Sequence, residues 1–153
     1  MDLIASQRIT AVIYVAARLR VADFLAAGPQ ASHELAQRTG AHEPSLRRLL
    51  RALVALGICK QVGGEQFELT AMGGHLVDTV SQSLKALVLF EGEMLLRSWG
   101  GLFESIRSGK NAGELAGVDN SFELMARNPE SVTTFNEAMV AYTRMAARRV
   151  GGL

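Results

Sequence analysis

Apolar residues recur at helical spacing along most of the chain, and the first stretch is the most apolar. From Asp2, a candidate N-cap, the chain runs to Ala27 without glycine or proline and then meets Gly28-Pro29. We therefore predict a helix over residues 2–27. Its apolar positions, which surround most of its circumference, are Leu3, Ile4, Ile9, Val12, Ile13, Val15, Ala16, Leu19, Val21, Phe24 and Leu25. Such a helix must be covered on more than one side, which favours a partner subunit over the alternative, the central helix of a monomer.

A more compact pattern follows. Ser32 is expected to cap a short helix over His33 to Arg38, and Glu43-Pro44 opens a second helix with a leucine stripe. Two short runs of β character then flank Gly63-Gly64, which predicts a hairpin. Two helices followed by a hairpin are the outline of a winged helix-turn-helix, here placed at about residues 28–78. The expected fold class is mainly α, a winged helix-turn-helix with a small β-hairpin wing embedded in additional dimerising helices.

The rest of the chain is expected to be helical, apart from a loose segment over Lys110 to Asn120. Thr70 is expected to cap a short helix that runs toward Val77. The further expected helices are Gln82 to Arg97, Ser98 to Ile106, Ser121 to Arg127, and one that starts at Asn128-Pro129 and is followed by Gly151-Gly152.

Composition narrows the class of protein. Of the 153 residues, 48% are hydrophobic and 20% are charged, so we expect a packed core. The formal net charge is +1, which excludes a strongly basic nucleic-acid-binding protein. A single cysteine excludes an internal disulfide. The apolar runs are far shorter than the ~20 residues of a membrane span, and no signal peptide is evident. A cytoplasmic protein without membrane contact is expected.

Polar residues offer little chemistry. Arg47, Arg48 and Arg51 lie opposite the leucine stripe, either as a DNA-recognition surface or as a solvated face paired with acids such as Glu43. The histidines are expected to be exposed, and neither they nor Cys59 predict a metal site or a nucleophile. The glycine pairs do not follow a buried strand and open a helix, so a cofactor loop is not expected.

Large apolar and aromatic side chains cluster in the second half, either as core or as one wall of a pocket for a flat apolar ligand. They are Leu89, Phe90, Met94, Leu95, Trp99, Phe103, Phe135, Met139 and Tyr142.

The order of these segments resembles the N-terminal domain of class I S-adenosylmethionine-dependent small-molecule O-methyltransferases. The stretches that carry the resemblance, which covers essentially the whole chain, are VAARLRVADFLAAGP, ELAQRTGAHEPSLRRLLRALVALGI, FELTAMG, LLRSWGGLFESIRSG, SFELMARNPE and FNEAMVAYT.

The resemblance implies a winged helix wrapped by dimerising and lid helices over residues 2–27 and 81–150, and a homodimer formed through them. It places the donor-binding loop and catalytic histidine in a following domain, which is expected to be absent from this chain. The chain alone is therefore expected to be inactive, with no catalytic residue, no bound metal and no cofactor of its own.

Site residues follow by position. Those that match the acceptor-lining positions of the family are Leu89, Phe90, Leu95, Trp99, Phe135 and Met139. Tyr142 and Thr143 match a place that reaches toward S-adenosylmethionine, although plant members often carry a His-Ser pair there. Leu89 and Phe90 replace what is often Met-Asn in plant enzymes, which favours a larger or more apolar acceptor such as a polyketide.

Three functions remain open at this point: a dimerisation and acceptor-binding module of a methyltransferase, a DNA-binding winged-helix regulator, and a dimer that only binds an aromatic ligand. The sequence identifies neither the acceptor nor its methylated position.

Overall fold

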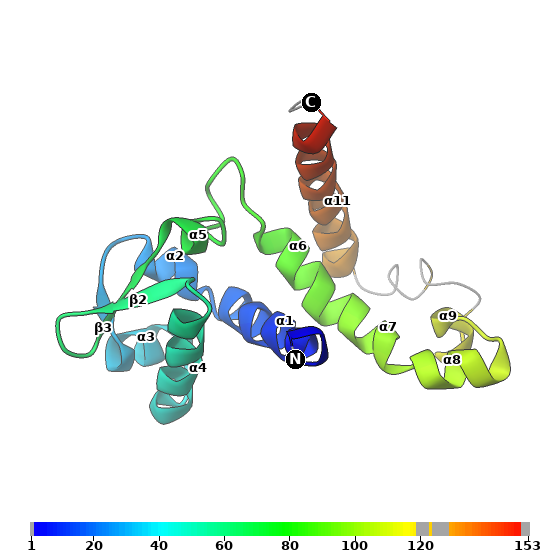
Figure 1. Cartoon of the computed structure of the whole chain (residues 1–153), viewed down its shortest axis with the longest axis horizontal. Helices are drawn as coiled ribbons and strands as arrows, with labels where there is room; N and C mark the ends of the chain where they lie inside the picture. Colours follow the sequence, from blue (N-terminus) through cyan, green and yellow to red (C-terminus); the bar gives the residue numbers. More distant parts are fainter. Residues whose placement is uncertain (1, 119–122, 124–128, 151–153) are drawn as a thin grey trace. The chain divides into compact units, whose positions relative to one another are not determined.

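A computed structural model of the chain is mainly helical and contains one small antiparallel sheet (Figure 1), as the predicted fold class requires. It describes residues 2–118, 123 and 129–150. The chain divides into two compact units, Met1–Lys85 and Ala86–Leu153, and each unit is described by itself.

The first unit opens with two helices rather than one. α1 (Asp2–Arg18) and α2 (Val21–Leu25) are separated at Arg20, whose φ of 57° and ψ of 30° are left-handed. The predicted continuous helix over 2–27 is therefore wrong. Three of the five residues of α2 are buried, and turning the chain at Arg20 gains that burial at the cost of one strained residue.

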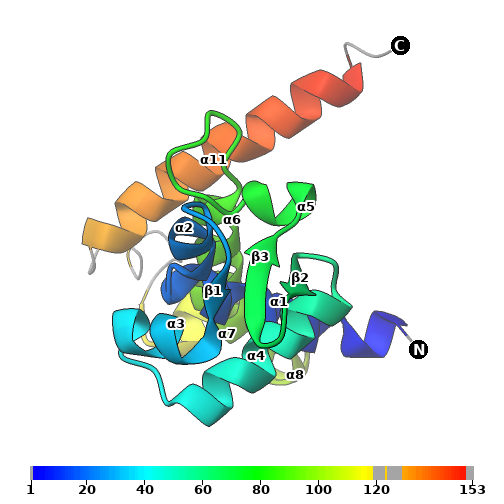
Figure 2. The ribbon, with the colours of Figure 1, turned by 90° about the vertical axis from the view of Figure 1, so that its left-hand side faces the viewer.

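A three-stranded sheet and two helices form the centre of this unit. The helices are α3 (Ser32–Thr39) and α4 (Glu43–Ala55), and the strands are β1 (Gln30–Ala31), β2 (Cys59–Val62) and β3 (Gln66–Leu69). The strand order is β1-β3-β2, and all pairs are antiparallel (Figure 2). The predicted hairpin around Gly63-Gly64 is confirmed, whereas β1 was not predicted because two residues are too few for an alternating pattern.

The core of the first unit comes from the helical leucine stripes and the hairpin. Leu35, Leu46, Leu50, Leu53 and Phe67 are each at most 1% exposed. Burying each of these side chains contributes roughly 1.5–3 kcal/mol, so they account for much of the stability of this unit. The leucine spacing anticipated this arrangement.

Ser32 does not cap α3 as predicted. Ser32 is the first residue of the helix and is fully buried, and its hydroxyl donates a hydrogen bond to Glu43 at 3.4 Å. The Glu34 carboxylate instead accepts a hydrogen bond from the Ala31 backbone nitrogen at 2.8 Å. Because Ala31 pairs with Gln66 in the sheet, the strand places the start of the helix one residue earlier.

Thr70 caps α5 (Ala71–Gly74), as predicted, by accepting a hydrogen bond from the Gly73 nitrogen at 3.1 Å. The helix ends at Gly74 instead of extending toward Val77. Gly73 lies against the Ile58 carbonyl oxygen, which a Cβ at position 73 would approach to 2.1 Å. Only glycine allows this close approach of two backbone segments.

A buried ion pair holds the end of the first unit together. Lys85 is only 7% exposed, and its Nζ lies 2.7 Å from the Asp23 carboxylate and 3.4 Å from that of Asp78. Asp23 also accepts a hydrogen bond from the Asp78 backbone nitrogen at 2.8 Å. Asp23, on α2, therefore bonds both to Asp78, in the connection that follows α5, and to Lys85, the first residue of the next helix.

In the second unit, one predicted helix is built from three consecutive segments. They are α6 (Lys85–Phe90), a π-helical segment η1 (Glu91–Leu95) and α7 (Leu96–Gly100). The predicted bounds, Gln82 to Arg97, and the start of the next helix at Ser98 are therefore wrong. The helix ends only at the Gly100-Gly101 pair.

Among the described residues, the further elements with given bounds are α8 (Leu102–Ser108), α9 (Ala112–Leu115) and α11 (Pro129–Val150). α9 lies within the segment expected to be loose, and Asn111 caps it by accepting from the nitrogens of Gly113 and Glu114. The start of α11 at Pro129 agrees with the prediction. The helix predicted over 121–127 lies outside the described residues except for Glu123.

Candidate functional site

The second unit pairs two aromatic side chains between α6 and α11. Phe90 and Phe135 meet edge to face, with ring centroids 5.5 Å apart and an interplanar angle of 67°. Phe90 is 7% exposed and Phe135 is half-buried. Two of the predicted acceptor-lining residues, which are 45 positions apart in the sequence, are therefore in contact. This geometry is typical of stable aromatic pairs.

A polar pair lies next to the aromatic pair along both helices. The Tyr142 hydroxyl donates a hydrogen bond of 2.6 Å to Oε1 of Glu91, the residue that follows Phe90. Phe135, Met139 and Tyr142 are spaced by four and then three residues, so they lie on one side of α11. The side of α11 that meets α6 and η1 thus changes from aromatic to polar along its length.

A π-helical segment begins directly after Phe90 and contains Glu91. Glu91 to Leu95 follow the wider π-helical turn, and such insertions into α-helices frequently occur at functional sites. Leu89 and Phe90 precede the segment, and Leu95 is its last residue. The sequence did not predict this feature, because one extra residue in a turn only slightly disturbs the apolar spacing. Glu91 was missed as a site residue for the same reason.

Glu91 affects the titration of its partner. The hydrogen bond to Glu91 raises the pKa of Tyr142, and partial burial and the negative charge of Glu91 raise it further. Tyr142 is thus a protonated donor at neutral pH. Glu91 has no cationic partner within the part of the chain that the structure describes.

The other predicted acceptor-lining residues are placed less closely together. Leu89 and Leu95 are half-buried on α6 and η1, whereas Trp99 on α7 is 64% exposed. Met139 is half-buried on α11. The structure thus joins Phe90 to Phe135 and leaves Trp99 on the surface of the chain.

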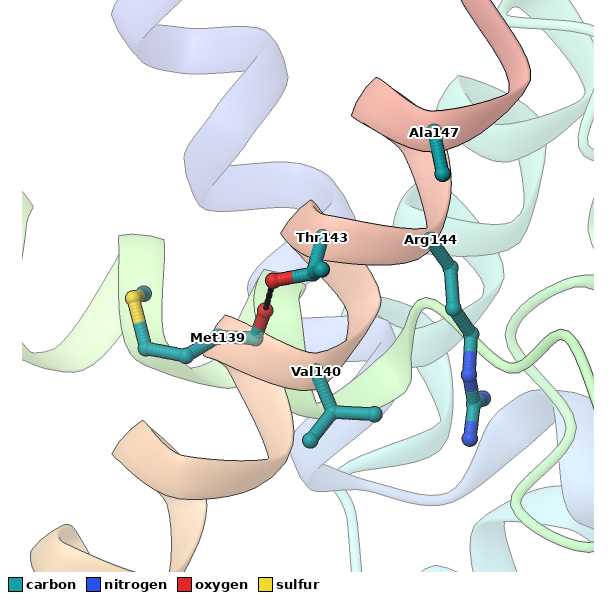
Figure 3. A pocket seen from close by; sticks show the side chains of 5 residues that line it. All are labelled: Met139, Val140, Thr143, Arg144 and Ala147. Atoms are coloured by element: carbon teal, nitrogen blue, oxygen red, sulfur yellow. Dashed lines mark hydrogen bonds between the residues drawn. The ribbon is translucent and has the colours of Figure 1, made fainter. Parts of the chain in front are cut away.

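A shallow hollow of about 380 Å³ lies along α11 (Figure 3). The residues that line it are Met139, Val140, Thr143, Arg144 and Ala147. Met139 and Thr143 were predicted as site residues, and the other three were not. The hollow is mostly apolar, and the Arg144 side chain extends along it in Figure 3.

The two residues predicted to reach toward S-adenosylmethionine, Tyr142 and Thr143, both form hydrogen bonds within the chain. The Tyr142 hydroxyl is bonded to Glu91, and Oγ1 of Thr143 donates to the Met139 carbonyl oxygen at 2.9 Å. A methyl donor needs a set of groups that hold its sulfonium and nucleoside, and these two engaged hydroxyls do not provide one.

The remaining polar residues show little arrangement for chemistry. His33, His42 and His75 are exposed, as expected. The described residues contain no cluster of three or more His, Cys, Asp or Glu side chains that could hold a metal ion. Cys59 is buried, and burial raises the pKa of its thiol to about 11, so it is a core residue rather than a nucleophile.

The three arginines of α4 are exposed, but Arg47 forms an ion pair with Glu65 in the hairpin. The expected partner, Glu43, instead accepts a hydrogen bond from Ser32. Arg48 donates to the Ser45 hydroxyl at 3.3 Å. Pairing of Arg47 with an acid weakens the case for a phosphate-binding surface here.

Among the described helices, none has the length and hydropathy needed to cross a bilayer.

Comparison with known proteins identifies the family. The sequence model of the O-methyltransferase dimerisation domain matches residues 1–79, more than half of the chain. The chain belongs to this family, in agreement with the resemblance of its sequence segments.

Similar proteins include methyltransferases of bacterial biosynthesis. The chain is 31% identical over 150 residues to the phenazine O-methyltransferase PhzM of Lysobacter antibioticus, covering 98% of this chain and 44% of that protein. It is 33% identical over 138 residues to the 8-amino-8-demethylriboflavin N,N-dimethyltransferase of Streptomyces davaonensis, covering 88% and 40%. The chain thus spans less than half the length of these relatives.

Solved structures agree on the fold. The crystal structure of LaPhzM matches with a TM-score of 0.91 at 30% identity, over 99% of this chain and 46% of that chain. The dimethyltransferase RosA from Streptomyces davawensis matches with a TM-score of 0.85 at 30% identity, over 94% and 44%. The O-methyltransferase NcsB1 from neocarzinostatin biosynthesis matches with a TM-score of 0.73 at 32% identity, over 84% of this chain and 43% of that chain, and was solved in complex with S-adenosyl-L-homocysteine.

Proposed function

We propose that this chain is the dimerisation and acceptor-lining part of an S-adenosylmethionine-dependent methyltransferase that acts on a small aromatic molecule. The proposal rests mainly on the family match over residues 1–79. It is supported by the apolar side chains of α1 that remain exposed in the single chain. The names of the relatives support an aromatic acceptor. Methylation itself is assigned to the whole enzyme, and this chain is not expected to catalyse it alone.

The dimer contact is proposed to include α1. Ile4 is 79% exposed, and Val15 is 40% exposed about three turns further along the same side of the helix. Exposed large apolar side chains at helical spacing are typical of surfaces that bind another protein. The partner is a second copy of this chain, because the family is defined by its dimerisation.

Sedimentation analysis tests this proposal. We expect the wild-type chain to be a dimer at micromolar concentration. The double substitution Ile4→Asp and Val15→Asp should raise the dissociation constant at least about tenfold, since two charges would be buried in the interface. Met72→Asp is the matched control, because Met72 is 61% exposed on α5, outside the proposed contact.

A wild-type chain that sediments as a monomer would contradict the proposed dimer. Circular dichroism of the double variant separates loss of the dimer from loss of α1. The same samples test the regulator alternative: DNA binding that weakens steeply with salt and with Arg51→Ala would replace the methyltransferase proposal.

The acceptor-lining role is proposed for Leu89, Phe90, Leu95, Trp99, Phe135 and Met139. The edge-to-face contact between Phe90 and Phe135 supports it, because the contact brings together two of these residues from different helices. Met139, another of them, lines the hollow on α11. The approach of Tyr142 and Thr143 to the methyl donor remains a prediction. A cytoplasmic location likewise remains a prediction.

A further inference from the structure

The Glu91 carboxylate is an unusual feature of the surface proposed to line the acceptor. It follows directly after the buried Phe90 in the sequence and lies in the π-helical segment. The three residues before it, Val88 to Phe90, are apolar, and Glu91 itself is half-buried. Its Oε1 accepts the hydrogen bond from Tyr142 at 2.6 Å.

The second carboxylate oxygen of Glu91 can still accept hydrogen bonds. An ionised carboxylate offers about four lone-pair sites, and Tyr142 uses one of them. In the described part of the chain, Glu91 has no lysine or arginine partner. A half-buried carboxylate beside aromatic side chains attracts a hydrogen-bond donor or a cation and repels an anion.

The Tyr142 hydrogen bond holds this carboxylate in one place. Tyr142 lies two turns after Phe135 on the same side of α11, and Glu91 directly follows Phe90, so the polar pair continues the aromatic pair. A ligand whose ring lies against the half-buried Phe135 would direct its substituent along α11 toward Tyr142 and Glu91. This arrangement resembles many small-molecule sites, in which apolar walls carry few fixed polar groups.

We propose that Glu91, positioned by Tyr142, is a specificity-determining residue that selects aromatic ligands bearing a hydrogen-bond-donating or cationic group, such as an amine or a phenol, and rejects ring carboxylates. This inference rests on the acceptor-lining role proposed above. It goes further by assigning the substituent that the ligand presents to this surface.

Equilibrium dialysis of the 153-residue chain tests the proposal with three ligands that share one ring: 1-naphthylmethylamine, 1-naphthol and 1-naphthoate. Naphthalene fluorescence reports the free concentration of each. We expect the ammonium and the phenol to bind about fivefold more tightly than the carboxylate. A fivefold difference in affinity is typical of an interaction between partly exposed charges, here the repulsion between Glu91 and the ligand carboxylate. Glu91→Gln should make the affinities for the ammonium and the carboxylate nearly equal while naphthol binding changes less than twofold.

Glu93→Gln is the matched control, because it removes the same charge from the same π-helical segment, two residues away. It should leave the preference intact. Tyr142→Phe keeps the carboxylate but removes its hydrogen bond, so the preference should fall by about half. This variant also carries the test if circular dichroism shows that Glu91→Gln does not fold.

Each remaining outcome has a distinct meaning. If the wild-type chain binds all three ligands without a charge preference, or if Glu93→Gln abolishes the preference as fully as Glu91→Gln, the inference about Glu91 is wrong and the aromatic surface stands. If the wild-type chain binds none of the three, the acceptor-lining proposal fails, and the role of Glu91 fails with it.

Discussion

Individual residues show how closely the first unit is packed. Gly73 has no room for a side chain, because the Ile58 carbonyl oxygen occupies the position of a Cβ, whereas nothing lies within 4 Å of the corresponding position on Gly74. Two adjacent glycines in one short helix therefore have different reasons for being glycine. The close approach at Gly73 lets α5 pack against the start of the hairpin.

This difference predicts opposite effects of two similar substitutions. Gly73→Ala should lower the free energy of unfolding by about 1–3 kcal/mol, the typical cost of overpacking, because backbone must move. Gly74→Ala should be neutral or stabilising by up to about 1 kcal/mol, since alanine favours the helix. Urea unfolding of both variants measures the effect. Equal stability of the two would show that the close contact is absent.

Asp23 predicts a dependence of stability on pH. Burial alone would raise its pKa, but hydrogen bonds from Lys85 and the Asp78 nitrogen, with the charge of Lys85, lower it overall below the ordinary value of 3.8. A carboxyl with a lowered folded-state pKa stabilises the fold above its unfolded-state pKa. That contribution is lost as the pH falls through the folded-state value.

Asp23→Asn should therefore destabilise the chain at pH 7 by about 1–3 kcal/mol, because the buried Lys85 loses its nearer acidic partner and keeps only the exposed Asp78. The difference from wild type should shrink as the pH falls below about 4, because the wild-type carboxyl then also becomes neutral. Thermal unfolding between pH 7 and pH 3 measures this. Asp78→Asn is the control, since Asp78 is 61% exposed and its side chain is expected to matter little. A constant difference at all pH values would show that the charge of Asp23 is not responsible.

At the scale of elements, the main departure from the sequence pattern is the break between α1 and α2. Apolar residues continue at helical spacing on both sides of Arg20, so local propensity favours a single helix over residues 2–27. The structure places Arg20 in a left-handed conformation, which costs about 1–2 kcal/mol for a residue with a side chain. Burial of α2 outweighs this cost.

The break predicts the sign of a substitution. Arg20→Gly should leave the free energy of unfolding unchanged or raise it by up to about 1 kcal/mol, because glycine adopts positive φ without strain. In a continuous helix the same change would lower it by about 1 kcal/mol, as we expect for Arg8→Gly within α1. Chemical denaturation compares the two variants. A loss of stability in Arg20→Gly as large as that in Arg8→Gly would contradict the break.

At the scale of the whole chain, the two units differ in how much core they contain. Most of the buried apolar side chains among the described residues belong to the first unit. Those of the second unit are Phe90, Val118, Ala138 and Ala141. Large apolar side chains of α8 remain exposed, including Phe103 at 69% and Ile106 at 79%. We therefore expect the second unit to gain stability from a partner of the proposed dimer.

Hydrogen exchange measures this difference. We expect the amides of α3 and α4 to keep their protection when the protein is diluted below its dimer dissociation constant. The amides of α6 and α11 should lose protection by at least about tenfold, because their stabilising partner dissociates. Protection that does not change with concentration in either unit would show that the second unit is stable by itself.

The sequence alone determined much of this protein. Leucine spacing, the Gly63-Gly64 hairpin, the cap at Thr70 and the start of α11 at Pro129 are local signals, and each was confirmed. The order of the segments was enough to indicate the methyltransferase family. Local propensity and turn chemistry act within a few residues, so they can be recognised without tertiary structure.

Only the tertiary structure decided the features that depend on distant partners. The turn at Arg20 exists because α2 is buried, and Ser32 becomes the first residue of α3 because β1 pairs with β3. The contacts of Phe90 with Phe135 and of Glu91 with Tyr142 join residues 45 and 51 positions apart, through a π-helical turn that apolar spacing does not reveal. These arrangements are set by burial and hydrogen bonding across the fold, whose energies outweigh the local preferences of the chain.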